Sequence, residues 1–376
     1  MSITIKRVRT GRELNSFVGF PLRLYKDMPA FVPCLYMDDR DTLDSRKNPA
    51  FEFCDAALFL AYKDGVPAGR VAAIINYKAN EKWGHDEVRF GWLDFIDDTE
   101  VSSALLEAVE TFGREHGMKT ITGPLGFTDF DPEGMLVEGY DHLSTMVLHH
   151  NWPYYKDHME GLGFSKEIDW LEYKIYVPDE MPEKYSRVAS IVSQRYGLHV
   201  RKITRREVRK SDIGYQLFDL INETYSQLYN FTILPKKMID KYVGFYLGVI
   251  DLKFVSLVED NDHNIVGFGI SMPSIARALK KCNGRLFPFG WFHVLKSMYL
   301  KYEDNVELLL IGIKPEYRNK GVNALIFSDL IPRFKAAGFK YAESNAELES
   351  NGAVQALWDG FKYEQCKRRR VFTKSL

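Results

Sequence analysis

The residues that could do chemistry gather between an apolar run at 306–313 and a predicted helix at 324–337. Arg318, Lys320 and Gly321 lie between these two segments. A strand that enters a short loop and then a helix points free backbone N–H groups and the helix dipole at one spot, which suits a phosphate or pyrophosphate. Gly321 lets the main chain approach a ligand closely, and the two cations add positive charge. The segment predicts an anion-binding loop; the alternative is an ordinary connection with a basic surface.

The order of residues in this loop resembles the acyl-CoA-binding loop of the GNAT superfamily of N-acyltransferases, whose pattern is Gln/Arg-x-x-Gly-x-Gly/Ala. Here the loop reads Arg318-Asn319-Lys320-Gly321-Val322-Asn323, so Asn323 departs from the pattern. The resemblance implies acetyl-CoA, or another acyl-CoA, as the acyl donor, and no metal. Donor binding would fall to Ile311, Gly312, Ile313, Arg318, Asn319, Lys320, Gly321, Val322, Asn323, Ala324 and Asn351.

In that family the strand before the loop has a bulge whose amides meet the pantetheine and the thioester carbonyl. By position, those amides belong to Ile311, Gly312 and Ile313. A glycine inside an otherwise apolar strand favours a bulge or a close backbone approach. Such an amide could also stabilise the oxyanion of a tetrahedral intermediate.

The segment from Asn351 to Trp358 resembles the next helix of the family. Asn351 falls where the family asparagine contacts the cofactor arm, and a helix N-cap is the alternative role for it. Trp358 stands where the family has a tyrosine that can protonate the departing thiolate. An indole cannot act as that acid.

An amine acceptor needs a general base to take its proton. Glu307, on the cofactor strand, is the first candidate, and Glu343, on the neighbouring predicted strand, is the second. Asn345, at the end of that strand, completes the candidate catalytic set. The alternative for Glu307 is a strand-end glutamate that faces solvent. The nine histidines and four cysteines form no readable catalytic pair or zinc cluster, so we expect direct transfer without a protein nucleophile.

The two halves of the chain repeat one plan. In each half, two apolar runs flank a turn rich in Asp, Gly or Asn, as in a hairpin, and a later amphipathic helix ends at a glycine, Gly117 or Gly338. This repeat predicts two domains, at 1–178 and 179–376, with an aromatic insertion in the second near 274–304.

The fold class that follows is α/β with α+β mixed sheets: two tandem GNAT-like domains, each a mixed, mostly antiparallel sheet flanked by helices. Most of the chain, including Gly123–Asp131, resembles an uncharacterised bacterial family of tandem GNAT-like proteins. Where the first half would need a cofactor loop it has acids, among them Asp94, Asp98 and Glu100, which would repel a pyrophosphate. We therefore expect a degenerate first domain without a cofactor loop.

Fifty Lys and Arg against 51 Asp and Glu give the 376 residues a net charge of −1, which argues against a nucleic acid or membrane partner. No uncharged apolar run approaches the ~20 residues of a membrane span, and the first residues alternate like a strand rather than a signal peptide. We expect a cytoplasmic protein, and a homodimer stays open. The basic run Lys367–Arg370 is expected on a solvated edge strand.

These patterns predict a bacterial acyl-CoA-dependent N-acyltransferase that transfers groups other than aminoacyl groups, with acetyl-CoA as the default donor and a small-molecule or peptide amine as acceptor. The aromatic insertion leaves room for a longer acyl chain. Two alternatives stay open. A non-catalytic acyl-CoA-binding or interaction module is favoured by Asn323 and Trp358. A Fem-like ligase that uses aminoacyl-tRNA is disfavoured by the near-zero net charge.

Overall fold

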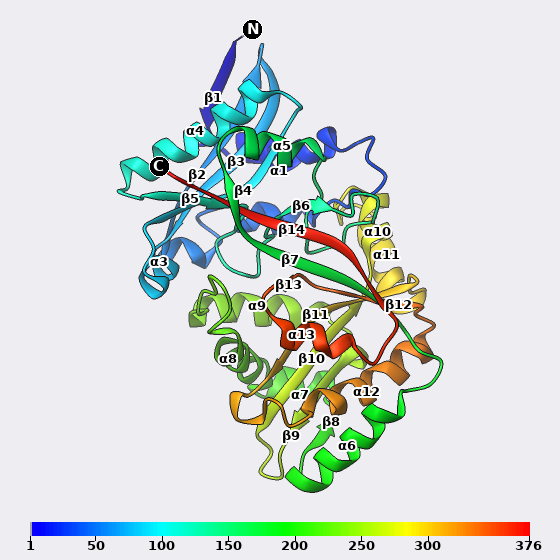
Figure 1. Ribbon diagram of the computed structural model, residues 1–376. Helices are drawn as coiled ribbons and strands as arrows, with labels where there is room; N and C mark the ends of the chain where they lie inside the picture. Colours follow the sequence, from blue (N-terminus) through cyan, green and yellow to red (C-terminus); the bar gives the residue numbers. More distant parts are fainter. Residues whose placement is uncertain (1) are drawn as a thin grey trace. The chain divides into compact units, whose positions relative to one another are not determined.

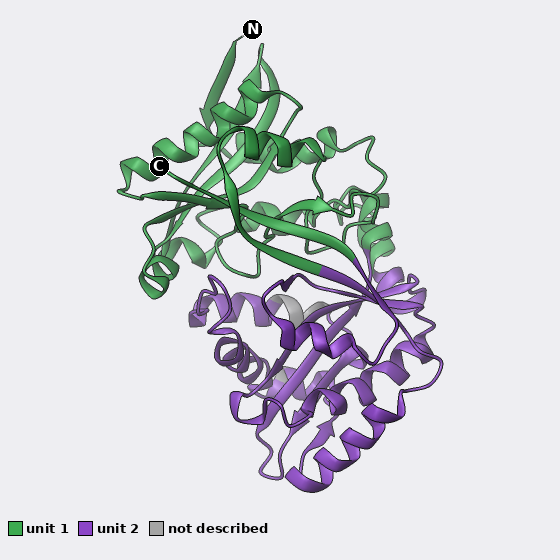
Figure 2. Cartoon of the chain, viewed as in Figure 1, with its two compact units in different colours: residues 1–171, 276–294, 366–376 green, residues 172–275, 295–365 purple. Residues whose placement is uncertain are grey.

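The computed structural model describes residues 2–376, apart from the side chains of residues 209 and 245–249. The chain forms two compact units (Figures 1 and 2). Unit 1 comprises residues 1–171, 276–294 and 366–376, and unit 2 comprises residues 172–275 and 295–365. Among the described residues, no helix has the length and apolar character needed to cross a bilayer.

This division differs from the predicted boundary between residues 178 and 179. Part of the predicted insertion, residues 276–294, packs with unit 1, where Tyr36 N donates to Gly284 O at 2.9 Å. The last residues, 366–376, also belong to unit 1, because the C-terminal strand pairs there with residues 120–123. Chain order alone therefore misassigns two segments that return to the first unit.

Unit 1 is built on one mixed sheet. Its strand order is β1 (Ile3–Arg7), β2 (Cys54–Lys63), β3 (Val66–Asn76), β4 (Glu87–Phe95), β5 (Thr120–Gly123), β14 (Tyr363–Ser375) and β7 (Ser165–Tyr176), with β6 (Met135–Glu138) on β14. The pairing of β4 with β5 is parallel, and the pairings of β1 to β4 and of β14 with β5 are antiparallel. The helices are α1 (Gly11–Leu24), α2 (Tyr36–Thr42), α3 (Tyr77–Trp83), α4 (Thr99–Glu115), α5 (Tyr154–Gly161), α10 (Ala276–Cys282) and α11 (Gly290–Leu295).

Unit 2 repeats this plan. Its strand order is β7, β12 (Tyr341–Ser344), β11 (Asn305–Ile313), β10 (Ile265–Pro273), β9 (Val255–Glu259) and β8 (His199–Arg201), with β13 (Glu347–Leu348) on β7. Only β11 and β12 pair in parallel on this path. The α-helices are α6 (Glu183–Tyr196), α7 (Arg205–Lys210), α8 (Ile213–Tyr225), α9 (Lys236–Val249), α12 (Val322–Ala337) and α13 (Gly352–Gln355). In each unit, a mixed and mostly antiparallel set of strands flanked by helices confirms the predicted fold class.

The same packing device recurs in both units where the long helix crosses its sheet. A Cβ at Gly69 of β3 would lie 2.6 Å from Leu105 of α4, and a Cβ at Gly269 of β10 would lie 2.6 Å from Ile326 of α12. Glycine at these positions lets each helix approach its sheet closely. Both helices connect two parallel strands, so each unit holds the same strand–helix–strand core.

The basic run Lys367–Arg370 suggested a solvated edge strand. The C-terminal strand is not at an edge of the sheet. β14 lies between β5 and β7, and Arg369 is fully buried. The two neighbours of Arg369 pair with a buried acid. The Asp169 carboxylate accepts from Arg370 Nε at 2.8 Å and from Arg368 Nη1 at 3.0 Å. Burial alone would raise the pKa of Asp169, but the hydrogen bonds from Arg370 and Arg368 hold it below its ordinary value.

The ion pairs of Asp169 predict that loss of its charge destabilises the protein more than loss of the charge of Glu138 does. Asp169→Asn keeps the shape of a side chain that is 1% exposed but leaves both arginines without their carboxylate, so we expect a loss of roughly 3 kcal/mol. Glu138→Gln is the matched control, because Glu138 pairs with Arg368 at 3.2 Å but is 60% exposed, and its loss should stay below about 1 kcal/mol. Urea denaturation measures both; equal losses would show that the cluster does not hold β14.

Candidate active site

Within the described chain, the first turn of α12 has no side-chain cap, although the Ala324 amide donates to Gly321 O at 2.9 Å. Gly321 is the N-cap residue, with a φ of +82°, and Asn319 two residues earlier also has a positive φ, +60°. In the described part of the chain, no side chain makes a capping hydrogen bond to this helix. The first N–H groups of an α-helix have no partner within the helix, so they need water, a side chain or a ligand. An anion at this helix terminus would satisfy them.

The equivalent helix of unit 1 supplies its own anion. Asp98 is the N-cap of α4, and its carboxylate accepts from the Glu100 amide at 3.0 Å. Lys63 pairs with the same carboxylate, and this hydrogen bond, the largest influence, holds the pKa of Asp98 below its ordinary value. The start of α4 is therefore already occupied by a negative charge of the chain itself, as the acidic sequence there led us to expect.

Strands β11 and β12 separate just before the predicted donor-binding residues. They pair in parallel from Asn305 with Tyr341 to Leu308 with Ser344. Beyond this point Asn345 bridges the two strands, since its amide donates to Leu308 O at 3.1 Å and its side chain donates to Leu309 O at 3.3 Å. The opening between the strands thus begins at Asn345.

The bulge in β11 lies two residues before Ile311, the first residue of the predicted bulge. The register with β10 shifts between Ile270 and Ser271, which leaves Leu309 as the extra residue, whereas Ile311 to Ile313 pair regularly. Gly312 has a different role from the predicted bulge. A Cβ at Gly312 would lie 2.5 Å from the ring of Phe268, so the glycine makes room for that ring.

Tyr225, at the end of α8, contacts the backbone in this opening. Its hydroxyl accepts from Ile311 N at 3.2 Å and donates to Ile311 O at 3.0 Å. Burial raises the pKa of Tyr225 well above its ordinary value, so the hydroxyl keeps its proton. No sequence pattern points to this tyrosine, because only the packing of α8 on β11 brings it to Ile311.

The two candidate bases lie side by side in the paired part of the strands. Glu307 of β11 and Glu343 of β12 are direct neighbours in the register, and both are buried, at 2% and 8% exposure. Burial excludes the alternative that Glu307 faces solvent.

A third carboxyl, Glu347 of β13, was not predicted. Desolvation by burial raises its pKa from 4.5 to about 7, although hydrogen bonds from Trp358 and Ser344 oppose the shift. The Trp358 indole N–H donates to Glu347 Oε1 at 3.1 Å. Trp358 is itself buried and packs against Phe327 of α12, so it is a core side chain that also orients a carboxyl. A carboxyl that titrates near pH 7 is suited to act as a general base.

The remaining predicted donor-binding residues surround the start of α12. Arg318 is exposed and donates to Thr224 O at 2.9 Å, and Lys320 lies over the rings of Tyr317 and Tyr196. The side chains of Val322 and Ala324 are buried, so these residues can offer only backbone groups to a ligand. Asn323 is partly exposed on the first turn. Asn351 is the N-cap of α13, the alternative role that its sequence position allowed.

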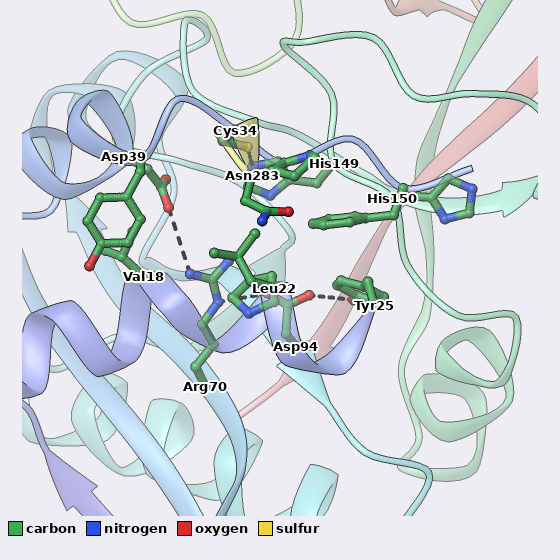
Figure 3. Close-up of a pocket in the computed structure, with 14 residues that line it drawn as sticks. Val18, Leu22, Tyr25, Cys34, Asp39, Arg70, Asp94, His149, His150 and Asn283 are labelled. Carbon is green, nitrogen blue, oxygen red and sulfur yellow. Dashed lines mark hydrogen bonds and ion pairs between the residues drawn. The ribbon is translucent and has the colours of Figure 1, made fainter. Parts of the chain in front are cut away.

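Unit 1 contains a small cavity of about 30 Å³, room for water but not for an acyl chain, with charged and apolar side chains in its wall (Figure 3). Arg70 lies between Asp94, whose carboxylate is 2.7 Å from Arg70 Nε, and Asp39. Tyr25 donates to the other oxygen of Asp94 at 2.5 Å. Asp94 is therefore part of a buried, paired network and not a free charge at the start of α4.

The same cavity holds a cysteine–histidine pair that the sequence did not reveal. Cys34 Sγ lies 2.7 Å from His149 Nε2, although the two residues are far apart in the chain. Burial raises the pKa of the Cys34 thiol and lowers the pKa of His149. Both shifts favour a neutral thiol bonded to a neutral imidazole, whereas a nucleophilic cysteine needs a lowered pKa. The pair is thus not an activated nucleophile.

Three side chains of unit 2 could hold a metal ion. The ligand atoms of His199, Glu259 and His263 lie within 4.8 Å of one another. Arg201 also contacts Glu259, at 3.2 Å, and brings a positive charge to the carboxylate that a cation would share. This arrangement resembles an ion-paired cluster that fixes β8 on β9.

Comparison with known proteins agrees with this geometry. No family model matches the chain. It is 27% identical to Protein YghO of Escherichia coli (strain K12) over 369 residues, covering 97% of this chain and 93% of that protein. It is 25% identical to the Bacterial ceramide synthase of Caulobacter vibrioides (strain NA1000 / CB15N) over 381 residues, covering 100% of this chain and 98% of that protein.

Two solved structures show the fold. A tandem GNAT protein from the clavulanic acid biosynthesis pathway matches with a TM-score of 0.57 and 11% identity, covering 100% of this chain and 98% of that one. A glucosamine N-acetyltransferase region of a fungal multi-domain β-N-acetylglucosaminidase matches with a TM-score of 0.57 and 12% identity, covering 99% of this chain and 38% of that one. The chain has the tandem GNAT fold that its sequence predicted.

The raised pKa of Glu347 predicts a pH-dependent stability. The folded protein binds the proton of the Glu347 carboxyl more tightly than the unfolded chain does. Burial of this carboxyl therefore lowers the free energy of unfolding only at a pH where the carboxyl ionises. Relative to Glu347→Gln, the wild type should lose stability as the pH rises from 4.5 to about 7, by at most about 3 kcal/mol, with no further change above. Urea midpoints of both proteins at pH 5, 6, 7 and 8 measure this; a constant difference across the series would refute the shift.

Proposed function

We propose that this protein is an acyl-CoA-dependent N-acyltransferase that joins a long acyl chain to the amine of a long-chain amino alcohol. The uncapped start of α12, with Arg318 and Gly321 ahead of it in a GNAT fold, is the observation that carries the donor assignment. The full-length similarity to a bacterial ceramide synthase supports the acceptor class, because a ceramide is an N-acylated long-chain amino alcohol. The same similarity favours a longer acyl donor over acetyl-CoA.

The chemistry needs a base for the amine and an acid for the thiolate. The amine nitrogen attacks the thioester carbonyl carbon, the carbon–sulfur bond breaks, the amine gives up a proton, and the CoA thiolate takes one. Glu347, with a pKa of about 7, can accept the amine proton at neutral pH, and Glu307 and Glu343 are the further candidates. The Tyr225 hydroxyl, protonated and bonded to Ile311, is the candidate acid in place of the tyrosine that Trp358 replaces.

Two alternatives remain as outcomes of the test. Asn323 and Trp358 depart from the GNAT pattern at working positions, which favours a protein that binds acyl-CoA without transferring the acyl group. A ligase that uses aminoacyl-tRNA would need a basic groove for the nucleic acid.

Product analysis separates these functions. Purified protein is incubated with palmitoyl-CoA or acetyl-CoA and with sphinganine, an amino sugar or a peptide amine, and amides are identified by mass while released thiol is counted. We expect N-palmitoylsphinganine with one thiol per amide, and slower product from acetyl-CoA. Acyl-CoA binding without any amide would support the non-catalytic module, and product from an aminoacyl-tRNA alone would support the ligase.

The donor assignment rests on Gly321 and can be tested without knowing the acceptor. Gly321→Ala places a Cβ 2.7 Å from Val188 and holds a side chain at a φ of +82°, at the point where the backbone must approach the pyrophosphate. Gly338→Ala, at the other end of α12, is the matched control, since its φ is +83° and no atom lies within 4 Å of the new Cβ. In both variants, an alanine at a positive φ costs ~1–2 kcal/mol of stability.

We expect CoA affinity, measured by calorimetry, to fall at least about tenfold in Gly321→Ala and to be unchanged in Gly338→Ala. Arg318→Ala should weaken binding by the loss of a charge-assisted hydrogen bond, ~1.5–3 kcal/mol. If Gly321→Ala binds CoA as tightly as Gly338→Ala does, the donor does not lie at this loop.

A further inference from the structure

Unit 1 exposes four large aromatic side chains within six residues of the insertion. Phe287 is 78% exposed, Phe289 76%, Phe292 52% and Trp291 44%. Elsewhere the same unit buries its phenylalanines, with Phe17 and Phe90 fully out of solvent. Exposing a side chain of this size forgoes ~1.5–3 kcal/mol of burial, so a contiguous group of them marks an interaction surface. We call residues 285–295 the aromatic segment.

The backbone of the aromatic segment is held firmly by unit 1. A Cβ at Gly284 would lie 1.9 Å from Cys34 O, so the chain just before the segment packs at backbone contact against unit 1. A Cβ at Gly290 would lie 1.8 Å from Arg285 O, so the segment also folds closely on itself. The Trp291 amide donates to Leu286 O at 2.8 Å, and Val294 is buried as an anchor. The exposed rings therefore extend from a backbone that is hydrogen-bonded and closely packed.

The charge around this segment has one sign. The 29 residues from Ser274 to Tyr302 contain no Asp or Glu, in a chain whose total charge is −1. They contain six basic residues: Arg277, Lys280, Lys281, Arg285, Lys296 and Lys301. Lys281 and Arg285, both in unit 1, are exposed, and Arg285 stacks over the Tyr36 ring at 4.5 Å.

The neighbouring acids of α2 do not cancel this charge. Asp39 lies 3.8 Å from Arg70, and Asp41 lies 2.7 Å from Lys47, so both carboxylates already have cations of their own. The third acid of α2, Asp38, is exposed and offsets at most one of the six cations of residues 274–302.

We propose that the aromatic segment docks unit 1 on the surface of an anionic lipid bilayer. Exposed aromatic rings with flanking Lys and Arg are the composition that places rings at the headgroup–acyl boundary and cations among the phosphates. The segment is far too short to span a bilayer, so it lies on the membrane. An anionic membrane offers a partner to both features of the surface: the acyl boundary to the apolar rings, and the phosphates to the Lys and Arg side chains. This revises the expectation that net charge excludes a membrane partner, because a local patch and not the total charge decides it.

The docking surface does not depend on acyl transfer. If the proposed function also holds, the same surface would bring the protein to the phase in which long-chain amines and acyl chains reside. The binding experiment therefore uses vesicles alone, and CoA affinity is measured in parallel on the same variants.

The test is flotation of the purified full chain with vesicles of phosphatidylcholine containing 30% phosphatidylglycerol, and with pure phosphatidylcholine, at ~50 mM and ~500 mM salt. We expect binding to the anionic vesicles that weakens in high salt. The variant Phe287→Ser with Phe289→Ser should bind at least about tenfold more weakly, since two exposed rings are lost. Lys281→Glu with Arg285→Glu should abolish the preference for phosphatidylglycerol.

The matched control is Val66→Ser with Ile191→Ser, which removes two apolar side chains exposed at 63% and 50% outside the segment and should leave vesicle binding unchanged. CoA affinity should be the same in all three double variants. Absence of wild-type binding to anionic vesicles overturns the proposal, as does equal binding by the phenylalanine variant. A wild-type dimer that the phenylalanine substitutions dissociate, without vesicle binding, would assign the surface to self-association instead.

Discussion

The backbone donors at the start of a helix must find an acceptor, and the two units of this protein meet that requirement in different ways. In unit 1 the Asp98 carboxylate accepts from the first turn of α4 and is itself paired with Lys63. In unit 2 the same position is Gly321, which has no side chain to offer and whose positive φ turns the chain directly into α12. The fold is the same, but one helix terminus is closed by its own charge and the other is left for an external anion. This single difference is the reason why we propose unit 2 as the donor-binding unit.

The rest of the candidate site follows from how β11 and β12 part. Asn345 holds the two strands at the point of separation, and beyond it the backbone of Ile311 is reached by the Tyr225 hydroxyl. Carboxyl groups lie along β11, β12 and β13, and burial brings Glu347 to a pKa of about 7. Burial thus raises the pKa of a carboxyl in unit 2, whereas in unit 1 it encloses the ion pair of Asp94 with Arg70.

Local patterns in the sequence predicted those features that neighbouring residues determine. The hairpins, the glycine-terminated helices and the acidic start of α4 are all encoded within short segments, and the tandem plan followed from their repetition. Features made by distant residues could not be predicted in this way. Tyr225 reaches Ile311 across 86 residues, and Cys34 reaches His149 across 115. The last strand looked like an edge because it carries a basic run. Only the fold shows that Arg368 and Arg370 pair with Asp169 and that Arg369 donates to His149 O. The bulge was placed at Gly312 because a glycine suggests one, but the ring of Phe268 is what requires that glycine.

Calorimetric titration of the intact chain with CoA tests the central claim most directly, because it counts helix termini that accept a pyrophosphate. We expect one CoA per chain, and we expect that number to be unchanged when Asp98 is replaced by Asn, because the carboxamide still caps α4. A stoichiometry of two would show that unit 1 also binds the donor, and the absence of any binding would show that the open start of α12 is satisfied by something other than CoA.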